Sequence, residues 1–459
     1  MKTKFHLLFM LLAVAIFSAL SCEKDPDPVP VLDGNLWLES QADVNEAGRL
    51  GHVEITGSLI IDGTREGESQ ITDLSPLSTI TRVNGELRIT ATTILRNLEG
   101  LNNLQEIGGN VNIGGNRGLL EIDALAGVTQ YTEPEVRIWA NDALTSISGL
   151  QGLTSASALQ VGRTPRLSSL DGLQNVTGVS GTLHLTGISG VRNLDGLSSL
   201  RYAGDILMYG EGIADISGLA ALDSVAGTLL LEEFRLLTDL SDFSGLRYFR
   251  DINLANNPVL SSLTGIDQIN PIIRHVRIDN CPLLTDLQGL EDIVECEWFT
   301  LRYNENLTSL KGLDNLRGII TLQIADNIRL ADITNLSNVE IIYNDLIIRD
   351  SDQITSLQGL ESLTSVGNVI LERNIRLNDI SALRNVTTLD GINFANNPVL
   401  TNLDAFQNLE RMEGFSASGN TGLTDFCGIA DAEIRLNYNA TDNAFNPTRD
   451  DLASGNCSQ

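Results

Sequence analysis

Basic residues are scarce in this sequence, and their scarcity narrows the possible partners. The 459 residues include 30 lysines and arginines against 59 aspartates and glutamates, which gives a formal net charge of −29 at pH 7. Proteins that bind nucleic acid need a basic surface to neutralise phosphates, so we expect no nucleic-acid partner. An excess of negative charge keeps a long exposed surface soluble, and this is the simplest reason for it.

Histidine is also rare, and the usual catalytic signatures are missing. The sequence shows no Ser/His/Asp arrangement, no Gly-rich phosphate loop and no metal-binding histidine motif, and its four histidines are His6, His52, His184 and His275. We therefore predict no catalytic residue, no metal site and no cofactor. Some parallel solenoids cleave polysaccharides with outward carboxylates, so Asp205, Glu232 and Asp251 are nominal catalytic candidates, although ordinary solvated acids explain them more simply.

The chain has only five cysteines, with no CxxC pair and no Cys/His cluster at zinc spacing. Cys427 and Cys457 both lie in the irregular C-terminal tail, and an oxidising exterior permits a disulfide between them. We predict this bridge. Cys281 and Cys296 lie just after one predicted strand and just before the next, so we expect them to remain unpaired. Cys22 ends the N-terminal apolar segment.

Only one long apolar run exists, from Leu7 to Leu20, and it is too short to span a bilayer with ordinary flanks. The phrase "SALSC" that ends at Cys22 resembles the bacterial lipoprotein signal, which implies a signal peptide over residues 1–21 and lipidation of Cys22. A plain secretory signal cleaved near Ser21 is the alternative. The charged, proline-rich segment 22–35 predicts an extended tether. Its acidic start resembles the surface-export signal of Bacteroidetes lipoproteins, which implies an outer-membrane lipoprotein exposed on the cell surface.

Repetition is the strongest positive feature of the sequence. The phrase "LANNPVLSSLTGI" at Leu254 returns as "FANNPVLTNLDAF" at Phe394. Both belong to a series of sixteen copies with a period of about 23.5 residues, in the range of leucine-rich solenoids. The apolar phrase that closes each copy begins at Leu74, Leu98, Ile122, Ile147, Leu170, Leu194, Ile216, Leu240, Leu263, Leu287, Leu310, Ile333, Leu357, Ile380, Leu403 and Phe426.

Each part of the unit LxIxxNxxLxxLxGLxxLxxIxG has a physical role. The LxI triplet predicts a short strand with alternate residues inward. An Asn follows three residues later, where its amide can pair backbone groups that a turn leaves open. We assign this position to Asn116, Asn141, Asn257, Asn304, Asn327, Asn374, Asn397, Asn420 and Asn439, with Cys281 as a structural substitute. The asparagines are interrupted for four coils, around Thr164, Ile188, Glu211 and Phe234.

A single coil cannot bury enough apolar surface to offset its ordering entropy, so the coils must stack into one array. The sequence predicts an α/β solenoid, right-handed and built on a parallel β-sheet, with about 16–17 coils and mostly strand and loop. The solenoid covers residues 53–440. An N-terminal cap over 36–52 and a C-terminal cap over 441–459 cover its ends, the latter with a short helix after Pro447.

The repeat resembles the leucine-rich repeat family and, through an IxGxLxI phrase, its cousin the receptor L-domain. That phrase occurs as "ITGSLII" at Ile55, "VNGELRI" at Val83 and "VSGTLHL" at Val179. The resemblance covers approximately residues 50 to 440. It implies an extracellular recognition scaffold and names no particular ligand.

Strand alternation leaves three outward columns: the positions before, within and after each triplet. Two groups of candidate ligand-binding residues fall on these columns. The first contains Arg137, Trp139, Gln160, His184 and Tyr209, with the two large rings expected on either side of a shallow trough. The second contains His275, Arg277, Trp298 and Arg302 on two consecutive coils. Exposed Trp, Tyr and Arg are typical binding anchors.

These observations favour a surface-anchored lipoprotein that acts as a non-catalytic recognition scaffold for a protein or glycan ligand. We expect a membrane association through the lipid anchor and a monomeric chain. A polysaccharide-degrading enzyme and a structural surface spacer are the alternatives.

Overall fold

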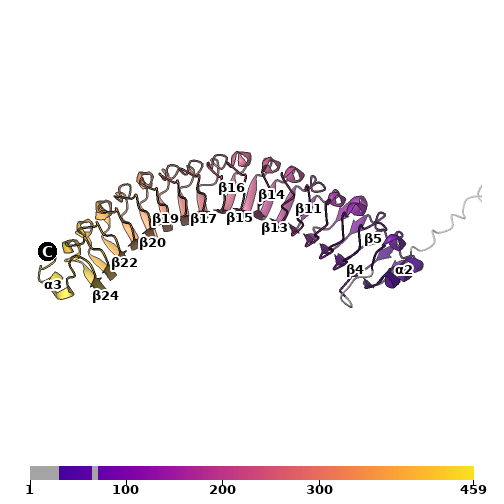
Figure 1. The fold of residues 1–459 in the computed structure, drawn as a ribbon, viewed down its shortest axis with the longest axis horizontal. Helices are drawn as coiled ribbons and strands as arrows, with labels where there is room; N and C mark the ends of the chain where they lie inside the picture. Colours follow the sequence, from indigo (N-terminus) through magenta and orange to yellow (C-terminus); the bar gives the residue numbers. More distant parts are fainter. Residues whose placement is uncertain (1–29, 65–70) are drawn as a thin grey trace, which may run out of the picture.

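The chain folds into an elongated arc of stacked coils (Figure 1). The structure is a computed structural model that describes residues 30–64 and 71–459. The predicted signal peptide, the lipidation residue Cys22 and most of the predicted tether lie outside the described residues. Within the described ranges, no helix combines the length and the apolar character needed to cross a bilayer.

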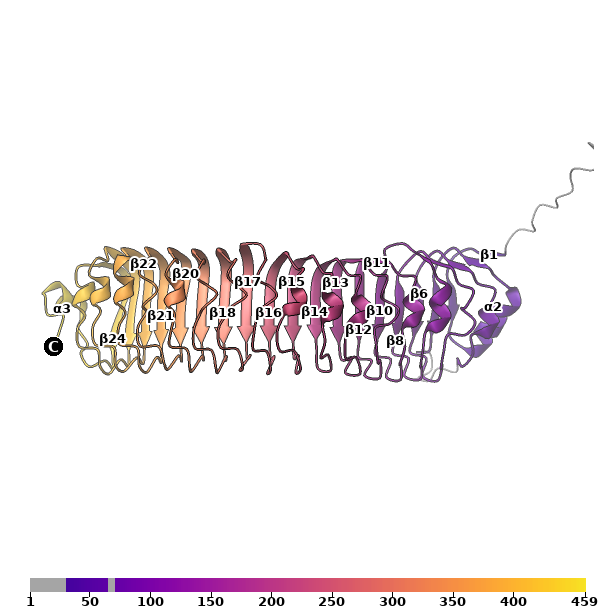
Figure 2. The ribbon, with the colours of Figure 1, turned by 90° about the horizontal axis from the view of Figure 1, so that it is seen from above.

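One long parallel sheet runs along the whole solenoid, and each strand pairs with the strand of the next coil (Figure 2). This arrangement confirms the predicted parallel β-solenoid of the leucine-rich-repeat type. In spatial order its strands are β2 (Leu36–Leu38), β4 (Leu59–Asp62), β6 (Leu87–Thr90), β8 (Val111–Gly114), β10 (Glu135–Trp139), β12 (Ala158–Gly162), β13 (Gly178–Thr186), β14 (Tyr202–Tyr209), β15 (Ser224–Glu232), β16 (Tyr248–Ala255), β17 (Ile272–Asp279), β18 (Glu295–Arg302), β19 (Gly318–Ala325), β20 (Ile341–Arg349), β21 (Ser365–Glu372), β22 (Thr388–Ala395), β23 (Arg411–Ser418) and β24 (Glu433–Thr441).

A second, smaller sheet covers the N-terminal coils. It consists of β1 (Val31–Leu32), β3 (Glu54–Ile55), β5 (Arg82–Val83), β7 (Glu106–Ile107) and β9 (Gln130–Tyr131), while β11 (Ser155–Ala156) pairs with the start of β13. From β13 onward the two strands of a coil merge into one strand of eight or nine residues. The short two-residue strands therefore mark only the first part of the array.

The return segments contain short 3-10 helices in place of α-helices, and these lie on the convex side of the arc (Figure 1). They are η2 (Ser75–Leu77), η3 (Asp123–Gly127), η4 (Ser148–Leu150), η5 (Asp195–Leu197), η6 (Ser217–Leu219), η7 (Ser241–Phe243), η8 (Thr334–Leu336), η9 (Ser381–Asn385), η10 (Asp404–Phe406) and η11 (Cys427–Ile429). Three residues per turn suit a tight return that must bring the chain back within one coil.

A continuous apolar core fills the space between the sheet and the return segments. In the coil of β16, Ile252 and Leu254 point inward from the strand, and Leu260 and Leu263 point inward from the opposite wall, each 1% exposed or less. The same positions are buried in coil after coil, and together they form one cluster along the molecule. Every internal coil is thus sealed by its two neighbours, as nearest-neighbour stabilisation of a solenoid requires.

Buried asparagines, three residues after the strand triplet, join each coil to the one before it. We call this series the asparagine ladder and the residue's place in each coil the ladder position. In Asn397 the side-chain oxygen accepts from the Asn374 N–H at 3.1 Å, and Nδ2 donates to the Leu371 carbonyl at 2.8 Å. The assignment of Asn439 to this ladder is wrong. Asn439 is an exposed residue within β24, and Asn443 takes the ladder position, accepting from the Asn420 N–H at 3.0 Å. The triplet of this coil is Tyr438 to Ala440, so the ladder residue falls four positions later than assigned.

The interrupted part of the ladder also differs from the expectation at one coil. The coil of β14 is one residue shorter than its neighbours after the strand, so Gly210 and not Glu211 takes the ladder position, and Glu211 is exposed. The ring of Phe234 from the next coil lies against Gly210, where any larger side chain would collide with it. An aromatic ring and a glycine here replace the hydrogen-bonded amide.

Short helices close both ends of the array. Helix α2 (Gln41–Leu50) begins at the N-cap Ser40 and buries Val44 and Ala47 against the first coil. Helix α3 (Arg449–Ala453) begins after a capping box between Thr448 and Asp451 and buries Leu452. A disulfide joins the last return segment to the chain after α3, so the C-terminal end is covalently closed. Its cysteines are Cys427 and Cys457.

Candidate functional site

The outward residues of the long sheet line the concave side of the arc (Figure 1). Their columns follow the parallel register, so residues of consecutive coils lie side by side at the spacing of neighbouring strands, about 4.8 Å. Both groups predicted from the sequence fall on this face. We call them the aromatic cluster (Arg137, Trp139, Gln160, His184, Tyr209) and the arginine cluster (His275, Arg277, Trp298, Arg302).

In the aromatic cluster the rings form a connected series. The centroid of Trp139 lies 5.8 Å from that of His184, which lies 6.1 Å from that of Tyr209. The guanidinium of Arg137 lies 5.5 Å from the Trp139 centroid, within the range of a cation–π contact. Gly162, on the strand between Trp139 and His184, has no side chain, so the indole covers it. The trough expected between Trp139 and Tyr209 is therefore occupied by His184.

His184 is held in its neutral form by its surroundings. It is half-buried between the two larger rings, and Gln160 pairs with it in the register of β12 and β13. Burial lowers the pKa of His184 below its usual value because the charged imidazolium loses hydration there. At neutral pH the cluster thus presents aromatic and amide groups, with Arg137 as its cation.

In the arginine cluster, His275 lies between an acid and an indole. Its Nδ1 is 3.5 Å from Oδ1 of Asp251, and its ring meets the Trp298 ring edge-on, with centroids 4.6 Å apart. The Asp251 side chain is only 9% exposed and pairs with Arg250 at 3.1 Å. Trp298 remains 39% exposed. The histidine thus holds one edge of the indole while the other side faces solvent.

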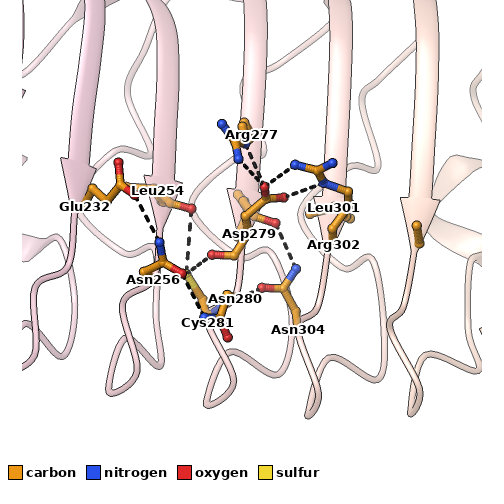
Figure 3. Close-up of polar contacts among 12 residues, drawn as sticks. Glu232, Leu254, Asn256, Arg277, Asp279, Asn280, Cys281, Leu301, Arg302 and Asn304 are labelled. Atoms are coloured by element: carbon orange, nitrogen blue, oxygen red, sulfur yellow. Dashed lines mark hydrogen bonds and ion pairs between the residues drawn. The ribbon is translucent and has the colours of Figure 1, made fainter.

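Two arginines of this cluster share one buried carboxylate, Asp279 (Figure 3). Arg277 donates from Nε and Nη2 to Oδ2 of Asp279, at 2.7 and 2.6 Å. Arg302, on the next strand, donates from Nε to Oδ1 at 3.1 Å and from Nη2 to Oδ2 at 2.5 Å. The Asp279 side chain is 8% exposed, whereas those of Arg277 and Arg302 are 46% and 33% exposed. We call these three residues the arginine triad; it carries a net positive charge.

A hollow of about 580 Å³ opens beside the triad, at the ends of strands β16 to β19. Its other walls come from Asn256, Asn280, Tyr303, Glu305, Asp326 and Ile328. The outward columns did not predict these six residues. Four of them lie one residue before the ladder position of their coils, with φ between 52° and 57°. These are Asn256, Asn280, Tyr303 and Asp326.

The missed residues have a common physical explanation. If the strand continued, the second residue after the triplet would point inward. The chain instead takes a left-handed turn at that residue, so its side chain points out at the rim of the sheet. The enrichment of Asn and Asp at this position, as in Asn396 and Asp350, is the sequence signal that could have revealed a fourth outward column.

The nominal catalytic acids are engaged in structural contacts. Asp205 accepts from the Thr228 N–H at 2.8 Å, Glu232 accepts from Asn256 at 3.0 Å, and Asp251 pairs with Arg250. In the described part of the chain, no three His, Cys, Asp or Glu side chains gather as a metal ion would need.

The two free cysteines of residues 30–64 and 71–459, Cys281 and Cys296, are buried and lie apart from the concave surface. Cys281 occupies a ladder position, whereas the expectation that Cys296 precedes the strand is wrong: β18 begins at Glu295, and Cys296 points inward within it. Burial raises the pKa of each thiol to about 12, so both remain protonated.

Comparison with known proteins gives two findings. A family model of the receptor L domain matches residues 53–122, a minor part of the chain at its N-terminal end. Among solved structures, the chain is similar to an internalin from Listeria monocytogenes at 18% identity. That alignment covers 89% of each chain with a TM-score of 0.32. No curated protein matches the sequence.

Proposed function

We propose that this protein is a cell-surface lipoprotein, anchored through Cys22, that acts as a non-catalytic recognition scaffold. The ligand, a protein or a glycan, binds the concave face of the long sheet. The observation that carries this proposal is the arrangement of large, partly exposed side chains on consecutive strands of one rigid surface. Such side chains are already ordered, so they lose little entropy when a ligand binds.

The two clusters supply the anchors of this surface. Trp139 and Tyr209 offer ring faces held in place by His184, and Trp298 offers an exposed indole beside charged groups. Aromatic and arginine side chains at ordered positions contribute most of the energy in typical interfaces. The receptor L-domain model that matches residues 53–122 at the N-terminal end also supports a binding role.

The test is a binding screen with the full chain against immobilised polysaccharides and extracellular proteins. Two double variants, Trp139→Ala with Tyr209→Ala and Trp298→Ala with Arg302→Ala, should fold, and at least one should weaken binding by about 1 kcal/mol or more. The matched control, Arg384→Ala with Gln407→Ala, changes exposed residues of the convex side and should bind normally. Release of sugar fragments from a polysaccharide would contradict the non-catalytic role, and an absence of any ligand would favour a spacer.

A further inference from the structure

We infer that the hollow beside the arginine triad is a binding subsite for a saccharide that carries a single carboxylate. Arg277 and Arg302 bind the carboxylate, and Tyr303 contacts the sugar ring. This inference rests on the proposed function and narrows it, because it names a ligand class for one part of the concave face.

The arginine triad is a pre-positioned anion site. Asp279 holds both guanidinium groups through their Nε and Nη2 atoms. Within residues 30–64 and 71–459, Nη1 of Arg277 and Nη1 of Arg302 donate to no acceptor. Two cations share one buried anion, so the triad itself keeps one positive charge on a chain whose net charge is −29, while Glu305 and Asp326 add two negative charges to the walls of the hollow. Guanidinium groups fixed on adjacent strands can donate to a carboxylate without losing further side-chain entropy.

The size and walls of the hollow suit a small ring-shaped ligand. Its volume of about 580 Å³ lies within the usual range of small-molecule sites. Tyr303 is 52% exposed and Ile328 is 46% exposed, and both line the hollow. The left-handed backbone at Tyr303 points this ring out of the coil. A sugar ring has apolar C–H faces that can pack on such a surface.

The remaining polar side chains of the hollow can form hydrogen bonds with the hydroxyl groups of a sugar. Nδ2 of Asn280 donates to Oδ1 of Asn256 at 2.8 Å, and Nδ2 of Asn256 donates to Glu232 at 3.0 Å, so both amides have a fixed orientation (Figure 3). Glu305 and Asp326 place carboxylates on the walls of the hollow. Carboxylate oxygens accept hydrogen bonds from hydroxyl groups, whereas they repel further anions. A lone carboxylate on a polyhydroxyl ring therefore fits better than a run of acidic residues in a peptide.

The direct test measures binding of the purified full chain to three oligosaccharides that end in a single glucuronate, galacturonate or sialate. Each is compared with its counterpart in which the carboxylate is reduced to a hydroxymethyl group. At least one acidic form should bind at least tenfold more tightly than its reduced form. Equal binding of the two forms, or no binding of any acidic form, overturns the inference. If hexaglutamate binds and the saccharides do not, the inference is overturned in favour of an acidic peptide.

Two conservative variants locate the binding. Arg302→Lys keeps a cation beside Asp279 but loses the planar fork, and Tyr303→Asn removes the ring while tolerating the left-handed backbone. Each should weaken the acidic saccharide about tenfold while leaving the melting temperature close to that of the wild type. Arg349→Lys is the matched control, because Arg349 occupies the same column on β20 and pairs with Glu372 at 3.1 Å. Unchanged binding in both Arg302→Lys and Tyr303→Asn would place the saccharide elsewhere and overturn the inference.

This inference and the proposed function can fail separately. A ligand from the screen that is lost with Trp139→Ala and Tyr209→Ala but binds normally to Arg302→Lys and Tyr303→Asn would sustain the concave-face scaffold. If, in addition, none of the acidic saccharides binds, the subsite is overturned and the scaffold is not.

Discussion

At the scale of single residues, the buried asparagines do more than end a turn. Each one pairs two backbone groups of the preceding coil that no strand or helix satisfies, as Asn397 does with Asn374 and Leu371. Where Cys281 takes the position, its thiol lies 3.9 Å from the Leu254 carbonyl, a weak contact, although Asn304 still accepts the Cys281 N–H at 3.0 Å. One substitution therefore does not interrupt the ladder, because the asparagine of the next coil still accepts a hydrogen bond from the backbone N–H at the substituted position.

The ladder can be tested with Asn397→Ala. Two buried backbone groups would lose their partner, at a cost of about 1–3 kcal/mol each. The midpoint of urea denaturation should fall accordingly. Asn439→Ala is the control, because among the described residues this exposed side chain bonds only Ser416, at 3.4 Å, and it should leave the midpoint almost unchanged. Equal effects of the two variants would contradict the ladder assignment.

His184 gives a prediction about pH. Its pKa is lowered by burial in the folded state, so the unfolded chain binds its proton more tightly. The stability associated with neutral His184 is present above its unfolded pKa, about 6.5. It is lost as the pH falls from that value through the folded pKa. NMR titration of the imidazole should therefore give a midpoint below 6.5.

His184→Gln provides the comparison for this effect. The variant should lose less stability than the wild type between pH 7 and pH 5, because it lacks the group that must take up a proton. A midpoint at or above 6.5 in the wild type would mean that the Trp139 and Tyr209 rings do not shield the imidazole.

At the scale of elements, the strands and the caps have different tasks. Internal strands are stabilised from both sides, whereas β2 and β24 each have a single neighbour among the described strands of the sheet. The N-terminal end relies on packing of α2, and the C-terminal end combines α3 with the disulfide. Stacking of Phe415 on Tyr438, with centroids 5.3 Å apart, extends the core beneath β24.

Removal of the disulfide should loosen the C-terminal cap. Cys427→Ser with Cys457→Ser removes a link usually worth about 2–4 kcal/mol, and the loss should be local because coils contact only their neighbours. Amide hydrogen exchange should accelerate in β24 and α3. The amides of α2, at the far end, serve as the internal control. Unchanged exchange in β24 would show that α3 and the aromatic stacking close the end without the bridge.

At the scale of the whole molecule, the stacked coils make a long concave surface whose two clusters belong to separate groups of coils, β10 to β14 and β17 to β18. A ligand that contacts both would span several strands of one rigid sheet. An anchor at the N-terminal end would place this surface away from the membrane, with the C-terminal cap at the far end.

Lipidation is the prediction that belongs to this scale. Cys22→Ala should move the protein from the membrane fraction to the soluble fraction, because lipid chains provide the binding to the bilayer. Incorporation of labelled fatty acid should disappear in the same variant. A wild-type protein that is already soluble, and whose mature chain starts elsewhere than Cys22, would contradict the lipoprotein signal and favour a plain secretory signal.

The sequence by itself determined the fold class, because a period of about 23.5 residues over sixteen copies leaves few ways to bury the leucines. It also located the two clusters, since parallel register carries strand alternation from coil to coil. Residue type alone does not mark the ladder in the last coil: Asn439 lies within the triplet, and Asn443, three residues after it, takes the ladder position.

Only the tertiary structure decided how the outward side chains meet. The Trp139 indole covers Gly162 and contacts His184, Asp279 holds Arg277 and Arg302, and the left-handed turn brings Tyr303 to the rim. These contacts depend on side-chain rotamers and on backbone angles at the strand ends, which repeat spacing does not specify. The period therefore predicts which residues share a face, and their packing determines which of them can form a site.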